Sequence, residues 1–201
     1  MLFAHRLIFA RHGQTDYNAE GRLQGQLDIP LNARGREQAR ALGGTLRNLI
    51  GSEIDRLDEA QAFFASPLKR ARETMEIVRD AMGLEPERYH LAPVLKELSF
   101  GVWEGLTWSE IEVKDPRGLR ARREDRWAFA PKGGESYAML ADRLRPWLGG
   151  LNAHAFVISH GGVARVLMAL IAGVSPAKAV GAPIIQGRAL VCENGGCRWI
   201  G

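Results

Sequence analysis

Residues 7–18 read LIFARHGQTDYN, and the change from apolar to polar residues within them decides the fold. The run Leu7–Ala10 is short and wholly apolar, which is typical of a strand buried on both faces of a sheet. An arginine, a histidine and a glycine follow it directly, and a turn-rich stretch continues as far as Pro30. The segment predicts a buried strand whose carboxyl end carries polar side chains.

Short apolar runs alternate with helical patterns along the rest of the chain. Residues 63–65 and 155–159 are two further apolar runs. Apolar residues at helical spacing predict helices over about 33–50, from 67 onward, and around 163–170, the last ending near Gly173. Asn32 is the expected N-cap of the first helix, and Ser66 and Pro67 are the expected N-cap and first residue of the second. This alternation favours an α/β domain with a mostly parallel sheet.

The remaining segments predict the outer parts of the domain. Residues 97–152 are interpreted as a mainly helical insertion with loops, and the last strands are expected to form a hairpin around 194–196. A chain of 201 residues usually folds around a single core, so residues 1–201 are expected to form one domain.

Polar residues follow three of the predicted strands. Arg11 and His12 come directly after the first strand, Arg70 lies in the first turn of the helix after the second, and His160 follows the strand over 155–159. The carboxyl ends of parallel strands open onto one crevice. These four side chains are therefore expected to converge.

Two arginines and two histidines at one crevice form an anion site, because arginine donates paired hydrogen bonds to phosphate oxygens. Gly13 and Gly161, each directly after a histidine, would let backbone N–H groups approach the same anion. The chain has no GxxxxGK[ST] loop, which excludes a nucleotide-cradling P-loop. A phosphoryl group is the expected ligand.

The amino-acid composition of the chain indicates which kinds of partner it binds. The chain has 27 basic and 23 acidic residues, a net charge of +4 that favours small acidic ligands and does not indicate nucleic acid. His160 and Arg165 interrupt the most apolar region, 155–174, whose uninterrupted part is too short for a membrane span. Polar residues from His5 onward break the apolar N-terminus before a signal-peptide core forms. We therefore expect a cytoplasmic location and no membrane partner.

The cysteines and the other histidines indicate no metal site and no cofactor. Cys192 and Cys197 lack the spacing of a zinc site, and two reduced thiols are expected. No pair of histidines has ligand spacing such as HExxH. His5, His90 and His154 are interpreted as surface or structural residues.

The string RHGQTDYN at 11–18 resembles the histidine phosphatase superfamily, also called the phosphoglycerate mutase-like family. One RHG would be weak evidence, but five further segments follow in the family's order up to residue 162. They are LQGQLDIPLNARGREQA at 23–39, ASPLKRARET at 65–74, LKELSFGVWEG at 95–105, GGES at 133–136 and ISHGG at 158–162. The resemblance implies a three-layer sandwich, with a mostly parallel central sheet flanked by helices.

The resemblance also implies a role for each matched residue. His12 would be the nucleophile that forms a phosphohistidine, and Arg11, Arg70 and His160 would clamp the phosphoryl oxygens. Glu97 occupies the family's proton-donor position, with Glu104 as a nearby competitor. The implied substrate-binding residues are Asn18, Gln24, Gly25 and Gly161.

Elementary chemistry agrees with these roles. An imidazole attacks only through an unprotonated nitrogen, so the site must keep His12 neutral and in one tautomer, and adjacent arginines disfavour the imidazolium. Phosphoryl transfer needs mainly positioning and charge stabilisation, which arginines and a second histidine supply without a metal ion. Glu97 must be protonated to donate to the leaving oxygen, and it can then accept a proton from water.

Some of these residues have plainer interpretations. Taken alone, Arg11 and Arg70 would be surface ion-pair partners. Residues 117–126, RGLRARREDR, are interpreted as a solvated helix face, and the alternative is a flap over the crevice that attracts an anionic substrate. Three tryptophans are interpreted as core or flap packing: Trp103, Trp108 and Trp127.

Three functions are weighed. The first is a metal-independent phosphomonoesterase for a small phosphorylated metabolite, which is a histidine acid phosphatase-type phosphoric monoester hydrolase. The second is a cofactor-dependent phosphoglycerate mutase, but such chains are generally longer and carry extra segments for which this one has no room. The third is a non-catalytic phospho-ligand binding module, which the full set of matched catalytic positions disfavours. The natural substrate and the choice between monomer and homodimer stay open.

Overall fold

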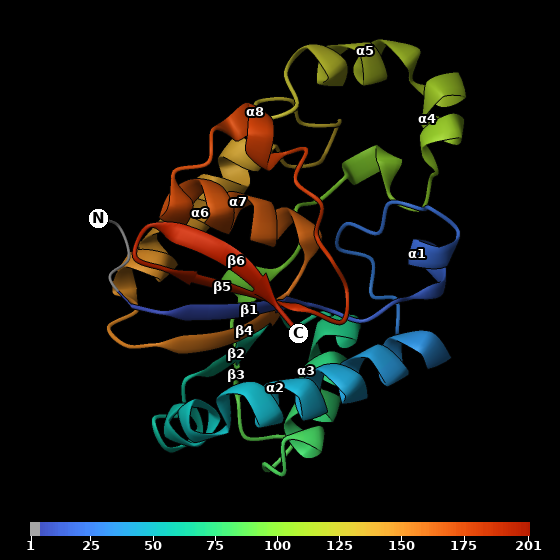
Figure 1. Ribbon diagram of the computed structural model, residues 1–201. Coiled ribbons are helices and arrows are strands. Elements are labelled where there is room, and N and C mark those ends of the chain that lie inside the picture. The colour runs from blue at the N-terminus through green and yellow to red at the C-terminus, as the bar shows by residue number, and fades with distance from the viewer. Residues whose placement is uncertain (1–4) are drawn as a thin grey trace.

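The computed structural model describes residues 5–201, and a six-stranded sheet forms its centre (Figure 1). The apolar residues 1–4 lie outside the described part. The strands stand in the order β3-β2-β4-β1-β5-β6. Strands β1 to β4 run parallel where they pair, β5 is antiparallel to β1, and β6 is antiparallel to β5. The predicted α/β class with a mostly parallel sheet is confirmed. The strand bounds are β1 Leu7–Arg11, β2 Phe63–Ala65, β3 His90–Leu91, β4 Ala155–Ser159, β5 Ala189–Glu193 and β6 Gly196–Ile200.

Helices cover both faces of this sheet and give the molecule three layers. Figure 1 shows α2 and α3 against one face and α6 and α7 against the other. The α-helices are α1 Asp16–Ala19, α2 Ala33–Glu59, α3 Lys69–Ala81, α4 Trp108–Lys114, α5 Pro116–Glu124, α6 Tyr137–Gly150, α7 Gly161–Ala172 and α8 Pro176–Ala179, and the short 3-10 helices are Pro93–Leu95 and Gly101–Trp103.

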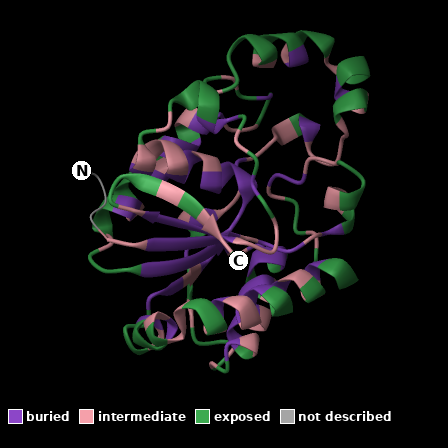
Figure 2. Cartoon of the chain, viewed as in Figure 1, coloured by how far each residue is buried: buried purple, intermediate pink, exposed green. Residues whose placement is uncertain are grey.

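The apolar run of β1 is explained by burial on both sides. Leu7 and Phe9 pack into the core under α6 and α7, whereas Ile8 and Ala10 pack into the core over α2 and α3. Successive side chains of a strand point to opposite faces, so a strand covered on both faces needs an unbroken apolar run. Figure 2 shows the consequence, inner strands that are buried between helices whose outer faces are exposed.

The helices that follow two neighbouring strands lie on opposite faces. The chain leaves β1 for α2 on one face and leaves the adjacent β4 for α7 on the other. The loops after the two strands therefore diverge, which opens a crevice at their carboxyl ends. This topology creates the space that the polar residues occupy.

The helix α2 is longer than the predicted span of 33–50. Asn32 caps it as expected, since its side chain accepts a hydrogen bond from the Gly35 amide at 2.9 Å. Ile50 has non-helical φ and ψ of −139° and 32°, and a second helical stretch continues from there to Glu59. Ile54 and Leu57 of that stretch are buried, but the polar residues around them hide the pattern in the sequence.

The predicted start of α3 is wrong. The helix begins at Lys69 with Leu68 as its N-cap, and the Ser66 side chain does not cap it. The Ser66 hydroxyl instead lies 2.7 Å from the Nε2 atom of His160, a contact between residues far apart in the sequence. A local pattern of serine and proline does not reveal such a partner.

The predicted hairpin near the C-terminus is confirmed, but the predicted pair of reduced thiols is wrong. Cys192 and Cys197 form a disulfide between β5 and β6. The antiparallel register places the two residues directly opposite each other, which their spacing alone does not reveal. The cysteines therefore give no support to a reducing compartment. In the described residues, no helix combines the length and apolar character of a membrane span.

Residues 97–152 contain three α-helices, as the mainly helical pattern predicts. Helix α6 joins the central core, whereas α4 and α5 stand apart from the sheet in Figure 1. A small cluster of Trp103, Ile111 and Leu119 holds α4 and α5 in place. Trp103 stacks on Phe129 and so packs as expected.

Candidate functional site

A cavity of ≈340 Å³ opens at the carboxyl ends of β1 and β4. It is lined by eight of the nine predicted site residues: Arg11, His12, Asn18, Gln24, Gly25, Arg70, Glu97 and Gly161. The ninth, His160, lies beside His12 with 5.2 Å between the ring centroids. The fold thus brings all nine together.

A larger cavity of ≈580 Å³ lies between Arg6, Glu53 and His154 and contains none of the predicted residues. Its arginine is already neutralised by ion pairs with Glu53 and Glu193, both at 2.6 Å. The Nδ1 atom of His154 accepts a hydrogen bond from the Arg6 amide at 2.7 Å, so this histidine has a structural role. We therefore place the functional site at the first cavity.

The pairing of β1 with β4 places the two site histidines side by side, at equivalent positions after the two strands. The parallel register pairs Arg11 with Ser159, and His12 and His160 are the next residues on the two strands. The amide of His12 continues the pairing by donating to the Ser159 carbonyl at 2.9 Å. Both side chains are buried, with exposures of 2% and 0%.

The tautomer of His12 follows from its neighbour. Its Nδ1 atom lies 2.7 Å from the Gly13 carbonyl oxygen, which can only accept a hydrogen bond. Nδ1 therefore carries the proton, and in the neutral ring the lone pair is on Nε2. The site supplies the single tautomer that a nucleophilic imidazole requires.

The expectation that the Gly13 amide faces the anion is wrong. This amide donates to the Thr74 hydroxyl at 3.1 Å. A Cβ atom at Gly13 would lie 2.3 Å from the Gly35 carbonyl oxygen, so the glycine is needed for close packing against the start of α2. Gly161, in contrast, lines the cavity at the N-terminus of α7.

Burial and neighbouring cations keep both histidines neutral. Burial lowers the pKa of His12 well below its usual 6.5, and the Arg70 and Arg11 guanidinium groups lower it further against the opposing hydrogen bond to Gly13. Burial likewise lowers the pKa of His160 well below 6.5, with Arg70 and His12 as the next causes. A protonated ring in this site would be unfavourable.

The two inner arginines are not the surface ion-pair partners that their residue type alone predicts. Arg70 is 1% exposed, and its two terminal nitrogens donate to the carbonyls of Leu27 at 2.6 Å and Gly25 at 2.7 Å. Burial lowers the pKa of Arg70 to about 10, while Glu97 opposes the shift. Burial also lowers the pKa of Arg11, again against Glu97. Arg70 is thus a buried cation beside the histidines, and Arg11 is a half-buried one.

Several buried polar atoms of the site have no protein partner. They are Arg11 Nε, Gln24 Oε1, Arg70 Nε and His160 Nδ1. Buried polar groups are nearly always hydrogen-bonded in folded proteins, and an exception needs an explanation. Three nitrogens and an amide oxygen left open around one cavity are explained by a polar ligand.

Glu97, and not Glu104, faces this cavity. Both carboxylate oxygens of Glu97 accept from the Gly162 amide at 3.1 Å, and one also accepts from Leu98 at 3.0 Å. A single Glu104 oxygen instead accepts from the backbone amides of Gln26 and Phe100. Glu104 therefore holds a loop, while Glu97 is left with access to the ligand.

The local backbone conformation places Asn18 and Gly25 at the cavity. The Asn18 Oδ1 atom accepts from Thr15 in the capping box of α1 and from Gln186 at 3.2 Å, which leaves its Nδ2 group as a donor. Gly25 has φ of 52°, and a Cβ there would lie 2.0 Å from Glu104, so this turn favours glycine.

Several residues of the site were not among those predicted. Ser66 and Thr74 hold His160 and the Gly13 amide, and Gln186 donates to the His12 carbonyl at 3.1 Å. Tyr137 and Arg165 line the cavity. Ser66, Thr74 and Gln186 lie far along the chain from the residues that they contact, and the one available signal was the position of Ser66 at a strand end.

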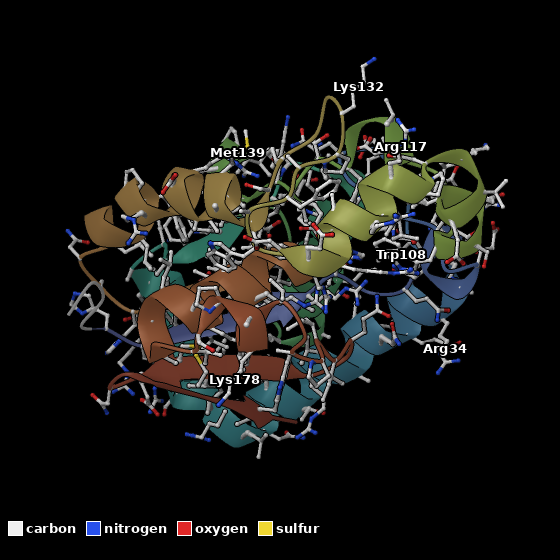
Figure 3. The ribbon with its side chains drawn as sticks, turned by 90° about the horizontal axis from the view of Figure 1, so that it is seen from above. Arg34, Trp108, Arg117, Lys132, Met139 and Lys178 are labelled. Atoms are coloured by element: carbon white, nitrogen blue, oxygen red, sulfur yellow. A yellow bond between two sulfur atoms is a disulfide. The ribbon has the colours of Figure 1, made fainter. Side chains whose placement is uncertain are left out.

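Both interpretations of residues 117–126 apply to part of the segment. Arg122 and Arg126 line the cavity together with Trp108. Arg117, Arg120 and Arg123 are exposed, and Arg117 lies on the outer side of α5 in Figure 3. Arg122 on α5 and the exposed Arg126 in the turn after it thus border the cavity, while the other arginines of the segment face solvent.

A parallel α/β sheet that gathers neutral histidines and buried arginines at its strand ends defines an enzyme that handles phosphoryl groups. In the described residues, no group of three or more histidine, cysteine or acidic side chains is arranged for a metal ion. The chain belongs to the histidine phosphatase superfamily (branch 1), whose family model matches residues 7–197.

Known relatives include phosphatases of small metabolites. The chain is 34% identical over 181 residues to the glucosyl-3-phosphoglycerate phosphatase of Mycolicibacterium vanbaalenii, covering 84% of this chain and 74% of that protein. It is 33% identical over 177 residues to the metal-independent phosphoserine phosphatase of Arabidopsis thaliana, covering 85% of this chain and 70% of the other. A solved mycobacterial glucosyl-3-phosphoglycerate phosphatase in complex with VO3 has a TM-score of 0.77 and 30% identity, covering 98% of this chain and 96% of that chain.

Proposed function

We propose that this phosphomonoesterase hydrolyses a small phosphate ester without a metal ion, by way of a phosphohistidine on His12. The observation that carries the proposal is the hydrogen bond of 2.7 Å from His12 Nδ1 to the Gly13 carbonyl, which leaves Nε2 free beside the buried Arg70 and the half-buried Arg11. Relatives that are phosphatases of glucosyl-3-phosphoglycerate and phosphoserine support a phosphoric monoester hydrolase.

In the first step, His12 Nε2 forms a bond to phosphorus as the bond from phosphorus to the ester oxygen breaks. Glu97 gives its proton to the leaving oxygen, so the product departs as a neutral alcohol. Arg11, Arg70 and His160 stabilise the charge on the three remaining phosphoryl oxygens. The Gly13 carbonyl stabilises the positive ring of the phosphohistidine through Nδ1–H.

In the second step, water attacks the phosphorus and the bond to Nε2 breaks. Glu97, now a carboxylate, accepts a proton from this water and returns to its starting form. The Gly161 amide and the Asn18 Nδ2 group donate to the phosphoryl oxygens, and Gln24 and Gly25 border the substrate. Inorganic phosphate is the product.

The lowered pKa of His12 supports the finer assignment to the histidine acid phosphatase type. A nucleophile that stays neutral below pH 6.5 keeps its lone pair in mildly acidic solution. We expect turnover to persist from neutral pH to below pH 6, which a pH profile of kcat/KM measures. An acid limb near 6.5 would contradict this assignment.

The test of the function is incubation with p-nitrophenyl phosphate in the presence of a metal chelator. We expect p-nitrophenolate release that the chelator does not reduce. Absence of release over a broad pH range and a panel of metabolite phosphates would overturn the proposal in favour of a binding module. A phosphoglycerate mutase would instead interconvert 2- and 3-phosphoglycerate, with stimulation by the bisphosphate, and we expect no such reaction.

Cytoplasmic location and the homodimer stay predictions. Size-exclusion chromatography with light scattering tests the oligomeric state, and cell fractionation tests the location. The proposed chemistry requires neither, because every proposed catalytic side chain comes from one chain.

A further inference from the structure

Three arginines of the cavity exceed what one phosphoryl group needs. The phosphoryl group is served by Arg11, Arg70 and the two histidines. The same cavity is also lined by Arg122, Arg126 and Arg165, here called the outer arginines. Arg122 lies in the last turn of α5, Arg126 lies in the turn that follows this helix, and Arg165 lies on α7.

The outer arginines have no acidic partner within the described residues. Arg22, which lines the same cavity, provides a contrast because it pairs with Glu20 at 2.7 Å and Glu110 at 3.0 Å. Among residues 5–201, no ion pair involves any of the outer arginines. Glu97 is the single acidic residue of the cavity lining, and it faces Arg11 and Arg70.

Backbone contacts hold two of these arginines in place. Arg126 donates to the Val180 carbonyl at 2.9 Å, and Arg165 donates from Nε to the Ala182 carbonyl at 3.1 Å. Each contact occupies one nitrogen and leaves the others of the planar guanidinium for a ligand. The guanidinium of Arg122 lies 4.5 Å from the ring centroid of Trp108, which also lines the cavity.

The gathered cations repel one another. Burial lowers the pKa of Arg122, and the charges of Arg126 and Arg165 lower it further. Like charges held together without a counterion destabilise a fold, and a bound anion removes that cost. The arrangement is that of a second anion site next to the phosphoryl site.

The second site is continuous with the first. A Cβ atom at Gly161 would lie 3.3 Å from a terminal nitrogen of Arg165 and 3.8 Å from Arg11 Nε, so these two arginines flank the same glycine. A ligand whose phosphoryl group lies beside Arg11 therefore extends past Arg165 toward Arg122 and Arg126. The Trp108 ring provides an apolar surface along this path.

We propose that the substrate is a phosphate monoester with a second anionic group, a carboxylate or a second phosphate, which the outer arginines bind. The phosphoryl end of this substrate rests on the proposed function. Three observations support the proposed binding of the second anionic group. The outer arginines have no acidic partner in the described part of the chain, backbone carbonyls hold two of them in place, and Arg165 lies beside Arg11.

The test measures binding of phosphonates, which the enzyme cannot hydrolyse. By isothermal titration, 3-phosphonopropionate and propane-1,3-diphosphonate are compared with propylphosphonate, which has the same carbon chain and no second anion. The same comparison is made with phosphonates of two to four carbons, because the length of the carbon chain sets the distance between the two anionic groups. We expect the best doubly anionic ligand to bind at least about tenfold more tightly, since a hydrogen bond to a charged group contributes about 1.5–3 kcal/mol. The carboxylate and phosphonate arms identify which second anion is preferred.

Charge variants assign this preference to residues. We expect Arg122→Gln and Arg126→Gln to reduce the ratio of the two affinities about tenfold. Arg120→Gln removes the same charge from an exposed position of α5 and is expected to leave the ratio unchanged. Equal binding of all the phosphonates by the wild type, or an equal effect of Arg120→Gln, would overturn the proposal.

Turnover separates this proposal from the proposed function. Phosphate release from 3-phosphoglycerate is compared with release from glycerol 3-phosphate, which has the same skeleton with a hydroxymethyl group in place of the carboxylate. A preference for doubly anionic phosphonates without release from any ester would contradict hydrolysis and support the second anion site. Release from both esters without any preference would support hydrolysis and overturn the second site.

Discussion

The reactivity of His12 depends on the backbone next to it. The Gly13 carbonyl selects the tautomer, and the conformation of Gly13 is in turn held by Thr74 and by close packing against Gly35. Burial and two arginines keep the ring neutral. In the proposed mechanism, His12 is thus made nucleophilic by the backbone beside it and by the two arginines that also bind the phosphoryl group.

Replacement of the nucleophile tests this arrangement. We expect His12→Ala to lower kcat by about a thousandfold or more, since no other group can form the intermediate. The wild type should yield an acid-labile, base-stable phosphoprotein on rapid quenching, and the variant should yield none. His90→Ala, at an exposed position of β3, is the matched control. Substantial turnover by the His12 variant, with an intact fold by circular dichroism, would refute the assignment.

Glu97 is tested through the leaving group. Glu97→Gln keeps the shape and an acceptor for the Gly162 amide, but it has no proton to donate. We expect a loss of about a hundredfold with alkyl phosphates and a milder loss with p-nitrophenyl phosphate, whose leaving group needs no proton. Steady-state kinetics on a series of esters measure the difference. Equal losses across the series would argue against a proton donor.

At the scale of elements, the strand ends and the start of α2 were predictable, and the start of α3 was not. The apolar runs at 7–10 and 155–159 identify buried strands, and their parallel pairing places the histidines together. Ser66 also lies at a strand end, but its partner His160 is 94 residues away. Local patterns predict burial and periodicity, whereas a side-chain hydrogen bond between distant elements requires the assembled fold.

The first turn of α7 contains a glycine that positions Glu97. A Cβ at Gly162 would lie 2.3 Å from a Glu97 carboxylate oxygen, an atom at the end of a flexible side chain. We expect Gly162→Ala to displace this carboxylate, with a reduction of kcat of about tenfold to a hundredfold for alkyl phosphates and a small change in stability. Kinetics and thermal unfolding measure the two effects.

A second glycine provides the control for this substitution. Gly149, near the end of α6, has open space around a Cβ. Gly149→Ala should leave kcat unchanged and stabilise the helix by up to about 1 kcal/mol. If Gly162→Ala also left kcat unchanged, the close contact with Glu97 would have no catalytic consequence.

At the scale of the whole molecule, the buried histidines make stability depend on pH. His12 and His160 have pKa values well below 6.5 in the folded protein and near 6.5 in the unfolded chain. As pH falls below 6.5, the unfolded chain binds protons that the folded protein does not. The free energy of unfolding should therefore decrease, by up to about 1.4 kcal/mol per pH unit for each histidine.

Urea unfolding between pH 7 and 5.5 measures this slope. His12→Asn and His160→Asn should each remove about half of it, because each deletes one of the two groups. His90→Asn should leave it unchanged, because that side chain is exposed. A flat dependence in the wild type would contradict neutral, buried histidines.

The sequence predicts the inner half of the site better than the outer half. Arg11, His12, Arg70 and His160 follow strands, so their convergence is a property of any parallel sheet. The direction of each arginine on α5 depends on a small separate core around Trp103. That core forms through contacts between loops and short helices, and the residue pattern of 117–126 does not contain them.

The inner and outer halves of the site are held by different parts of the fold, and this has a consequence for engineering the substrate specificity of the enzyme. Strand pairing between β1 and β4 fixes the reacting groups, and the Trp103 cluster independently fixes α4 and α5. Redesign of α4 and α5 can therefore alter which compound is accepted without moving the atoms that break the bond. The reacting groups can stay in place while α4 and α5 are replaced, which makes the molecule a scaffold for phosphatases of new specificity.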